Sequence, residues 1–349
     1  MSKDLRTFLE ATRAAGPQFF ATVKKPLSTR FEPSVLQEKL SRRGRYPVLF
    51  CPKIEGSRLP LVTNVFGSYE LLGLALDVTP QMMWRTGRCA VFEEYRKRRG
   101  ASIAPKYVPA DRAPVRQTVL KGSEADLGLL PVVHHAEGDA GKYISIGVTF
   151  TRNPDTGIIN AGVYRQQVTG RDRIAMYMGA AHHGSFNARR YAELKKPMPV
   201  VTVIGHHPAV AIGAASGTPQ HLSELDTVGG LLGEPLEVIP GLTVDLPVPA
   251  AAEIVVEGII DATQQYIFAS DQLAAFLPAE ISQQAVQTFV ARNRHQLLAQ
   301  YIVRRIQRKS DFNLREIAFQ FFQVFQDAYS GHGDMAGRNS QSVDSDNPL

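Results

Sequence analysis

Short runs of strand-forming residues, separated by turn signals, restrict the fold of this chain more than any other feature of its sequence. Such runs occupy residues 115–120, 144–151, 157–167 and 173–178. The stretches between them include Asn153-Pro-Asp-Thr-Gly157 and Thr169-Gly-Arg-Asp172, which are rich in the residues that favour tight turns. Because strands joined by tight turns pair with antiparallel neighbours, this region is predicted to form an antiparallel sheet or barrel.

The residues before this region alternate between helical and extended patterns, as is typical of an α/β domain. Helices are predicted at residues 3–15, 69–76 and 80–98, and buried strands at 46–52 and 61–65. The Pro-rich, charged stretch 105–114 has the composition of a linker. We therefore predict an N-terminal α/β domain over residues 1–114.

The central domain is predicted to extend over residues 115–268. Past its hairpins, helices are expected at residues 185–195 and 222–232, and strands at 200–204, 209–214 and 253–260. Together with the N-terminal domain, these elements place the chain in the α+β class.

Two amphipathic helices are predicted within residues 269–330. An apolar stripe runs through residues 282–309, and Asn313-Leu-Arg-Glu316 has the pattern of a capping box that opens a second, phenylalanine-rich helix. Such helices cover the chain's own core or pack on a second copy, and the rich phenylalanine face leads us to expect a homo-oligomer. Residues 331–349 are polar and rich in Gly, Ser and Asp, so this tail is predicted to be disordered.

Composition argues against several classes of protein. No apolar run is long enough to cross a bilayer, and charged residues interrupt positions 1–16, so neither a membrane span nor a signal peptide is expected. Two cysteines, Cys51 and Cys89, do not make a disulfide framework, and a cytoplasmic protein is the expectation. The net charge of +6 arises from short basic runs. No nucleic-acid motif accompanies these runs, so we interpret them as solvated helix faces.

Polar side chains are dense between residues 160 and 183, in a segment that otherwise has the pattern of buried strand. Asn160, Arg165 and His182, with Glu224 further on, offer an amide, a guanidinium, an imidazole and a carboxylate. Amide, imidazole and carboxylate ligands together suit a divalent cation such as Mn²⁺ or Mg²⁺. Spacing alone leaves open that they are cross-strand polar pairs. Strict strand alternation would also put Arg165 on the face opposite Asn160, unless the strand bulges near Gly162.

Several segments follow one another in a recognisable order along residues 1–261. They are Leu5-Arg-Thr-Phe-Leu-Glu10, Ile159-Asn-Ala-Gly-Val-Tyr-Arg-Gln-Gln167, Ala181-His-His-Gly184, Ser223-Glu224 and Pro249-Ala-Ala-Ala-Glu-Ile-Val-Val-Glu-Gly258. In this order they resemble the UbiD family of reversible, non-oxidative decarboxylases, which use prenylated FMN. The resemblance implies an N-terminal α/β domain followed by a split β-barrel of the flavin-reductase type.

The resemblance also implies roles for individual residues. Asn160, His182 and Glu224 would hold Mn²⁺ or Mg²⁺, which bridges to the flavin phosphate, and K⁺ is a further candidate ion. Arg165 would lie over the reactive ring of the flavin and contact the substrate carboxylate, and Gln166 and Ser216 would line the cofactor. The implied substrate is a small aromatic, heteroaromatic or α,β-unsaturated carboxylic acid. A flavin prenyltransferase would supply the cofactor.

Other polar residues near these segments have simpler interpretations. His183 is expected to be a neighbour of the site, and the pair His206-His207 to be structural. Glu253 and Glu257 lie four apart on a predicted strand, so they share a face, where carboxylates usually pair with an arginine. Gly229-Gly230 is interpreted as a turn near a helix end, not as a phosphate loop.

The sequence departs from the family after residue 260. Members continue with a Glu/Asp-Gly-Pro-Phe-Gly-Glu segment, which supplies the proton donor, whereas this chain runs directly into Asp261-Ala-Thr-Gln-Gln. The family's C-terminal α/β domain is also replaced by the two predicted helices. Three alternatives follow: a shortened decarboxylase with a relocated acid, a different reaction on the same scaffold, or a non-catalytic paralogue that acts as a subunit.

Overall fold

A computed structural model of the chain describes residues 3–179 and 182–261, all of which belong to one compact unit. The predicted C-terminal helices (269–330) and tail (331–349) lie outside the described residues. Within those residues, no helix is long and apolar enough to cross a membrane.

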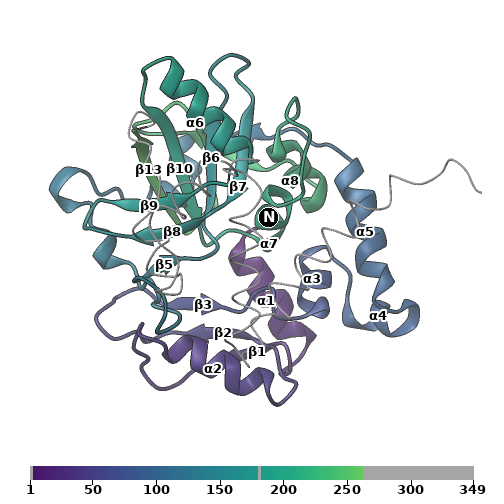
Figure 1. Cartoon of the computed structure of the whole chain (residues 1–349). Helices are drawn as coiled ribbons and strands as arrows, with labels where there is room; N and C mark the ends of the chain where they lie inside the picture. Colours follow the sequence, from purple (N-terminus) through teal and green to yellow (C-terminus); the bar gives the residue numbers. More distant parts are fainter. Residues whose placement is uncertain (1–2, 180–181, 262–349) are drawn as a thin grey trace, which may run out of the picture. The chain divides into compact units, whose positions relative to one another are not determined.

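The main sheet is antiparallel throughout. Its order is β13 (Ile254–Ile260), β10 (Met198–Ile204), β6 (Val148–Arg152) and β7 (Ile159–Val163). Figure 1 shows these strands side by side, with helix α6 (His183–Glu193) packed on them. The predictions of antiparallel pairing, of a strand at 200–204 and of a helix at 185–195 are confirmed.

A smaller antiparallel sheet continues directly from the main one. Its order is β5 (Tyr143–Ile144), β8 (Arg165–Val168) and β9 (Ile174–Tyr177). The predicted single strand 157–167 is therefore two strands, since Tyr164 separates β7 from β8 and the chain passes from one sheet to the other. Among the described residues the strands form four sheets and no closed ring, so the split barrel stays a prediction.

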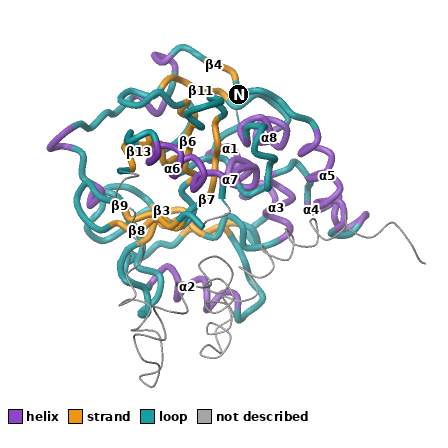
Figure 2. Tube along the Cα trace, turned by 45° about the horizontal axis from the view of Figure 1, so that its top comes forward, coloured by secondary structure: helices purple, strands orange, loops and turns teal. Residues whose placement is uncertain are grey.

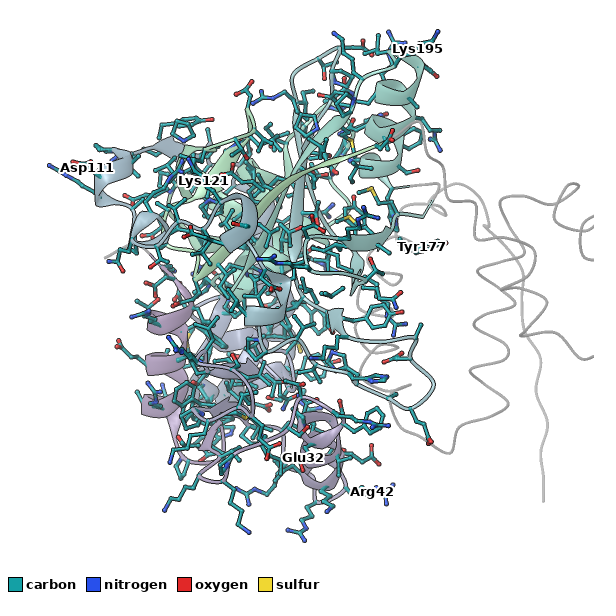
Figure 3. All side chains as sticks on the ribbon, turned by 90° about the vertical axis from the view of Figure 1, so that its left-hand side faces the viewer. Glu32, Arg42, Asp111, Lys121, Tyr177 and Lys195 are labelled. Atoms are coloured by element: carbon teal, nitrogen blue, oxygen red, sulfur yellow. The ribbon has the colours of Figure 1, made fainter. Side chains whose placement is uncertain are left out.

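The N-terminal residues build a three-stranded sheet covered by helices. The strands are β1 (Phe20–Thr22), β2 (Val48–Cys51) and β3 (Leu61–Thr63), with β1 and β2 parallel. Helix α1 (Leu5–Ala15) begins with a capping box between Asp4 and Thr7. Sequence reasoning missed β1 and helix α2 (Glu32–Ser41); Figure 3 labels Glu32 and Arg42 at the two ends of α2.

The predicted helix 80–98 is broken. Helix α3 (Tyr69–Ala75) is followed by α4 (Pro80–Thr86) and α5 (Cys89–Gly100). Gly87 separates the last two with a φ of 78°, a left-handed value that glycine adopts at little cost and that ends a helix.

The segment after α5 contains short 3-10 turns and one strand. These are β4 (Lys106–Tyr107) and the turns Ala110–Arg112, Pro114–Arg116, Gly122–Glu124 and Leu127–Leu129. β4 pairs with β11 (Glu237–Pro240), which also pairs with β12 (Pro247–Pro249). The predicted strand 115–120 is wrong, because Pro114 begins a 3-10 turn at this point.

Two buried helices lie at the centre of the core. They are α7 (Pro208–Ala214) and α8 (Glu224–Leu232), and Figure 2 shows α7 beside β6 and β7. The predicted strand 209–214 is wrong, because Pro208 occupies the first turn and the His207 side chain caps the helix by accepting from the Ala209 amide. Phe8 of the N-terminal region belongs to the same hydrophobic core as Phe150 and Leu231 of the central region. The core therefore does not separate the two regions, and the domain boundary at 114/115 stays a prediction.

Candidate functional site

The start of helix α8 is fastened to strand β7, and this junction positions the first candidate residues. Ser223 caps α8 by accepting from the Leu225 amide, and its hydroxyl donates to the Ile159 carbonyl over 2.9 Å. The next residue, Glu224, thereby lies beside Asn160 on β7. Strand β7 and the start of α8 therefore meet here, although Ile159 and Ser223 are 64 residues apart in the sequence.

Glu224 and Asn160 form a buried polar pair. Their side chains are 3% and 6% exposed, and the Asn160 amide hydrogen-bonds to the carboxylate. The Ala161 amide also donates to Glu224 Oε2 over 3.0 Å. Burial raises the pKa of Glu224, although the hydrogen bonds from Ala161 and Asn160 act in the opposite direction.

Two histidines border this pair in different ways. His183 Nδ1 lies 3.0 Å from Glu224 Oε1, so the residue that the sequence presented as a neighbour contacts the carboxylate. His182 is more exposed, and its ring meets the edge of the Tyr164 ring at 5.7 Å. The Tyr164 hydroxyl in turn donates to Asn160 Oδ1 over 3.3 Å. The structure therefore brings Asn160 and Glu224 into contact, and His182 adjoins them through Tyr164.

The donor set at this junction fits a divalent cation. No three His, Cys, Asp or Glu side chains converge within the described residues, so the Asn160 amide oxygen is the further side-chain donor that this junction offers. An amide oxygen, a carboxylate and an imidazole are suitable ligands for Mn²⁺ or Mg²⁺. Among the described residues, the groups that act on the buried Glu224 carboxylate are amide donors and His183, and a cation would offset its charge.

Arg165 is the first residue of β8 and directly follows Tyr164 in the chain. Its side chain is 59% exposed and forms an ion pair with Asp139. The guanidinium carbon lies 4.2 Å from the centre of the Tyr143 ring, in the geometry of a cation–π contact. Asp139 also accepts from the Ala136 amide over 3.2 Å. No motif or spacing in the sequence pointed to Asp139 or Tyr143 as partners of this arginine.

The side chains of Gln166 and Ser216 both form hydrogen bonds to other groups of the protein. Gln166 is fully buried, where its amide donates to Thr149 and accepts from Thr202, each over 3.0 Å. Ser216 accepts from the Tyr95 hydroxyl over 3.1 Å and donates to the Ile212 carbonyl. Their predicted contacts with a cofactor stay predictions.

A pocket of about 300 Å³ lies between α5 and the segment that leads into α8. Its lining residues are Arg96, Arg99, Gly100, Thr218, Pro219, Leu222 and Thr227. Asn160, Arg165 and Glu224 do not line it.

The other polar residues are structural. Glu253 forms a two-bond ion pair with Arg6, as predicted, whereas Glu257 accepts from the Leu242 and Thr243 amides. The buried ring of His206 lies 3.2 Å from the Ile146 carbonyl. Gly229 and Gly230 lie within α8, so their interpretation as a turn is wrong.

Two family models match the chain. The first, described as the 3-octaprenyl-4-hydroxybenzoate carboxy-lyase N-terminal domain of UbiD, matches residues 20–86. The second, described as the Rift-related domain of the same carboxy-lyase, matches residues 106–267. The second match contains every residue of the candidate site.

Solved structures of UbiD-class enzymes are similar to this chain. HmfF from Pelotomaculum thermopropionicum, solved with FMN, is 29% identical with a TM-score of 0.66, over 74% of this chain and 55% of that chain. An evolved dimeric form of HmfF was solved with prFMN, with the same identity and score. Vanillic acid decarboxylase of Sedimentibacter hydroxybenzoicus is 28% identical with a TM-score of 0.66, covering 74% and 55%.

A third enzyme shares the fold at lower identity. Apo 3,4-dihydroxybenzoic acid decarboxylase of Klebsiella pneumoniae is 23% identical with a TM-score of 0.66, over 76% of this chain and 57% of that chain. The described chain thus spans little more than half the length of these solved relatives.

Proposed function

Because the chain belongs to the UbiD family, we propose that it is a non-oxidative decarboxylase of a small aromatic, heteroaromatic or α,β-unsaturated carboxylic acid. It would use prenylated FMN and a divalent metal. The observation that carries the proposal is the buried Asn160–Glu224 pair. Asn160 lies on β7, and Arg165 begins β8, the next strand along the chain.

Each part of the site would have a separate task. Asn160, Glu224 and His182 would hold the divalent ion, whose charge offsets both the buried carboxylate and a flavin phosphate. The bound flavin would supply an electron sink for the bond that loses CO₂. Arg165 would orient the substrate carboxylate, a task that suits a planar guanidinium with paired donors.

The Asp139–Arg165 ion pair supports this role for Arg165. Asp139 is only 15% exposed, so it holds the arginine from the protein side and leaves the more exposed guanidinium accessible to a second anion. The aromatic ring of Tyr143 supports the same guanidinium from another side. An arginine fixed in this way loses less conformational entropy when it binds a carboxylate.

A non-catalytic paralogue remains the second candidate. Its support is the absence from the sequence of the Gly-Pro-Phe-Gly segment that the family resemblance leads one to expect after β13. A scaffold protein would not need an intact metal pair, and the retained Asn160 and Glu224 argue for catalysis.

The test uses the full chain, produced together with a flavin prenyltransferase and supplied with Mn²⁺. CO₂ release is measured from vanillic acid, 3,4-dihydroxybenzoic acid and a panel of unsaturated acids. We expect turnover by the wild type and a loss of at least about 100-fold in Arg165→Ala, with flavin absorbance retained. The matched control is Arg173→Ala, an exposed arginine between β8 and β9.

The control variant is expected to keep wild-type turnover. A wild-type protein that holds flavin and metal but releases no CO₂ from any acid would contradict the decarboxylase proposal and favour the paralogue. An Arg165→Ala protein with full activity would remove Arg165 from the mechanism.

A further inference from the structure

A histidine in the hairpin that precedes β5 and a serine that directly follows β5 form a close pair near Arg165. His135 Nε2 lies 2.6 Å from Ser145 Oγ, and His135 Nδ1 lies 3.4 Å from Ser34 Oγ on α2. The Ser145 side chain is exposed, whereas the His135 ring is half-buried behind it. Ser145 follows Tyr143, whose ring contacts the Arg165 guanidinium, by two residues.

The hairpin that carries His135 is fixed to the N-terminal segment. The His134 amide donates to the Thr29 carbonyl and the Phe31 amide donates to the His134 carbonyl, each over 2.9 Å. The Phe31 ring packs against the His134 ring with their centres 4.8 Å apart. His135 is therefore held at a defined place between α2 and the β5–β8–β9 sheet.

Three charged or titratable groups act on His135. Burial lowers the pKa of His135, the Asp139 carboxylate raises it, and Arg165 and His134 lower it. On the α2 side the contact is Ser34, which carries no charge. A single carboxylate, Asp139, thus links the arginine that would hold the substrate to the histidine beside it.

We propose that Ser145 and His135 form the proton relay of this site. The inference rests on the proposed function and adds the acid that decarboxylation requires. When the C–C bond to the carboxylate breaks, CO₂ leaves and the electron pair on carbon takes the Ser145 hydroxyl proton. The His135 imidazolium returns its Nε2 proton to Ser145 Oγ, and solvent water then reprotonates His135, so one proton is consumed for each CO₂ released.

The ordinary role for such a pair is to hold a loop, and the two roles predict different kinetics. A loop contact affects stability or KM, whereas a proton donor affects kcat and its pH dependence. In the decarboxylation direction the imidazolium is the active form. Wild-type kcat should therefore fall as the pH rises through the pKa of His135, and this limb should be absent from His135→Gln.

The experiment measures kcat and KM against pH for the loaded full chain, with vanillic acid and 3,4-dihydroxybenzoic acid as probes. We expect His135→Gln and Ser145→Ala each to lower kcat by about 10²–10⁴-fold with a smaller change in KM. Ser145→Ala removes only a surface hydroxyl, so it keeps the test valid if His135→Gln folds poorly. Glu137→Gln, an exposed position on the hairpin that carries His135, is the matched control and should keep the wild-type profile.

A second readout needs no turnover. In the flavin-free full chain, ¹⁵N NMR of the histidine side chains should show that Ser145→Ala shifts the His135 Nε2 resonance and its titration midpoint. The resonances of His134 should not move.

The outcomes separate the two proposals. Product from the wild type with an unchanged rate and pH profile in His135→Gln would overturn the relay alone. A His135 resonance that is indifferent to Ser145→Ala would also overturn it. Failure of the loaded wild type on every acid would contradict the proposed function and remove the relay with it.

Discussion

Glu224 is the residue whose environment is hardest to explain by folding alone. A buried carboxylate is costly unless it is paired and hydrogen-bonded, and truncating a partner of a buried charge costs about 3–5 kcal/mol. The donors to Glu224 are the Ala161 amide and the Asn160 side chain, with the His183 ring beside them. A cation bound beside this carboxylate would offset its charge, which neutral donors alone do not. The proposed metal role of Glu224 would explain why this carboxylate is buried.

His207 carries a prediction about stability and pH. Burial lowers the pKa of His207 to about 4, compared with an ordinary value of about 6.5. The folded chain keeps this ring neutral while the unfolded chain protonates it, so the contribution is present above the ordinary pKa and is lost as the pH falls toward 4. His207→Asn keeps a side-chain acceptor for the Ala209 amide but removes the titration.

We therefore expect the unfolding free energy of His207→Asn to fall less than that of the wild type between pH 7 and pH 4, by up to about 3 kcal/mol. Urea titrations at each pH measure this difference. His221→Asn, at an exposed position, is the control and should follow the wild type. Parallel curves for all three proteins would contradict a buried, neutral His207.

Sequence reasoning reached part of the candidate site at this scale. Asn160 and Glu224 were paired through the family resemblance, and their contact is present. His183 was expected to be a neighbour of the site, and it lies beside Glu224. Tyr164 was missed as a contact of Asn160, because only the folding of the chain around β7 brings its hydroxyl to that side chain. Asp139 was missed for the same reason, since its hairpin lies 26 residues before Arg165 in the chain.

At the scale of elements, helix α8 shows how closely this core is packed. A Cβ on Gly229 would lie 2.2 Å from the Ile103 carbonyl oxygen, and one on Gly230 would lie 2.2 Å from the Ala101 carbonyl oxygen. The two glycines let the helix approach the backbone that follows α5. The end of α5 is tied to the same helix, because Arg98 donates to the Leu231 carbonyl.

Gly229→Ala is expected to destabilise the protein by about 1–3 kcal/mol, although alanine is normally the better helix former. The physical reason is the clash with the Ile103 carbonyl, which backbone movement must relieve. Chemical denaturation measures the change. Gly258→Ala on β13 is the control, because a Cβ there meets no atom within 4 Å. A Gly229→Ala protein as stable as the wild type would contradict the close approach.

The sequence predicted elements with clear end signals and missed the others. Helix α1 and the antiparallel strands carried capping or turn residues, and both were found. Residues 209–214 are apolar on every side because α7 is buried all round, so they lack the helical periodicity that would distinguish them from a strand. Strand β1 is three residues long, which is too short for a pattern to develop.

At the scale of the whole molecule, the candidate residues come from segments that one core unites. The Asn160–Glu224 pair depends on β7 and α8. Arg165 and the His135–Ser145 pair depend on β8, on β5 and on the hairpin before β5. The N-terminal segment holds that hairpin through backbone bonds at Thr29 and Phe31. Sites at such junctions between parts of a chain are where ligands commonly bind.

The similarity to the solved relatives covers only part of their length. The similarity covers about three-quarters of this chain but little more than half of HmfF. Under the proposed function, the matched part would hold the metal and the flavin. The activity would then depend on this chain's own proton relay.

The most direct test of the central claim is a native mass spectrum of the full chain, co-produced with a flavin prenyltransferase in the presence of Mn²⁺. We predict that the wild type carries a prenylated flavin and a divalent ion together, and that Glu224→Gln loses the ion while remaining folded. A folded wild-type protein free of both flavin and metal would contradict the account.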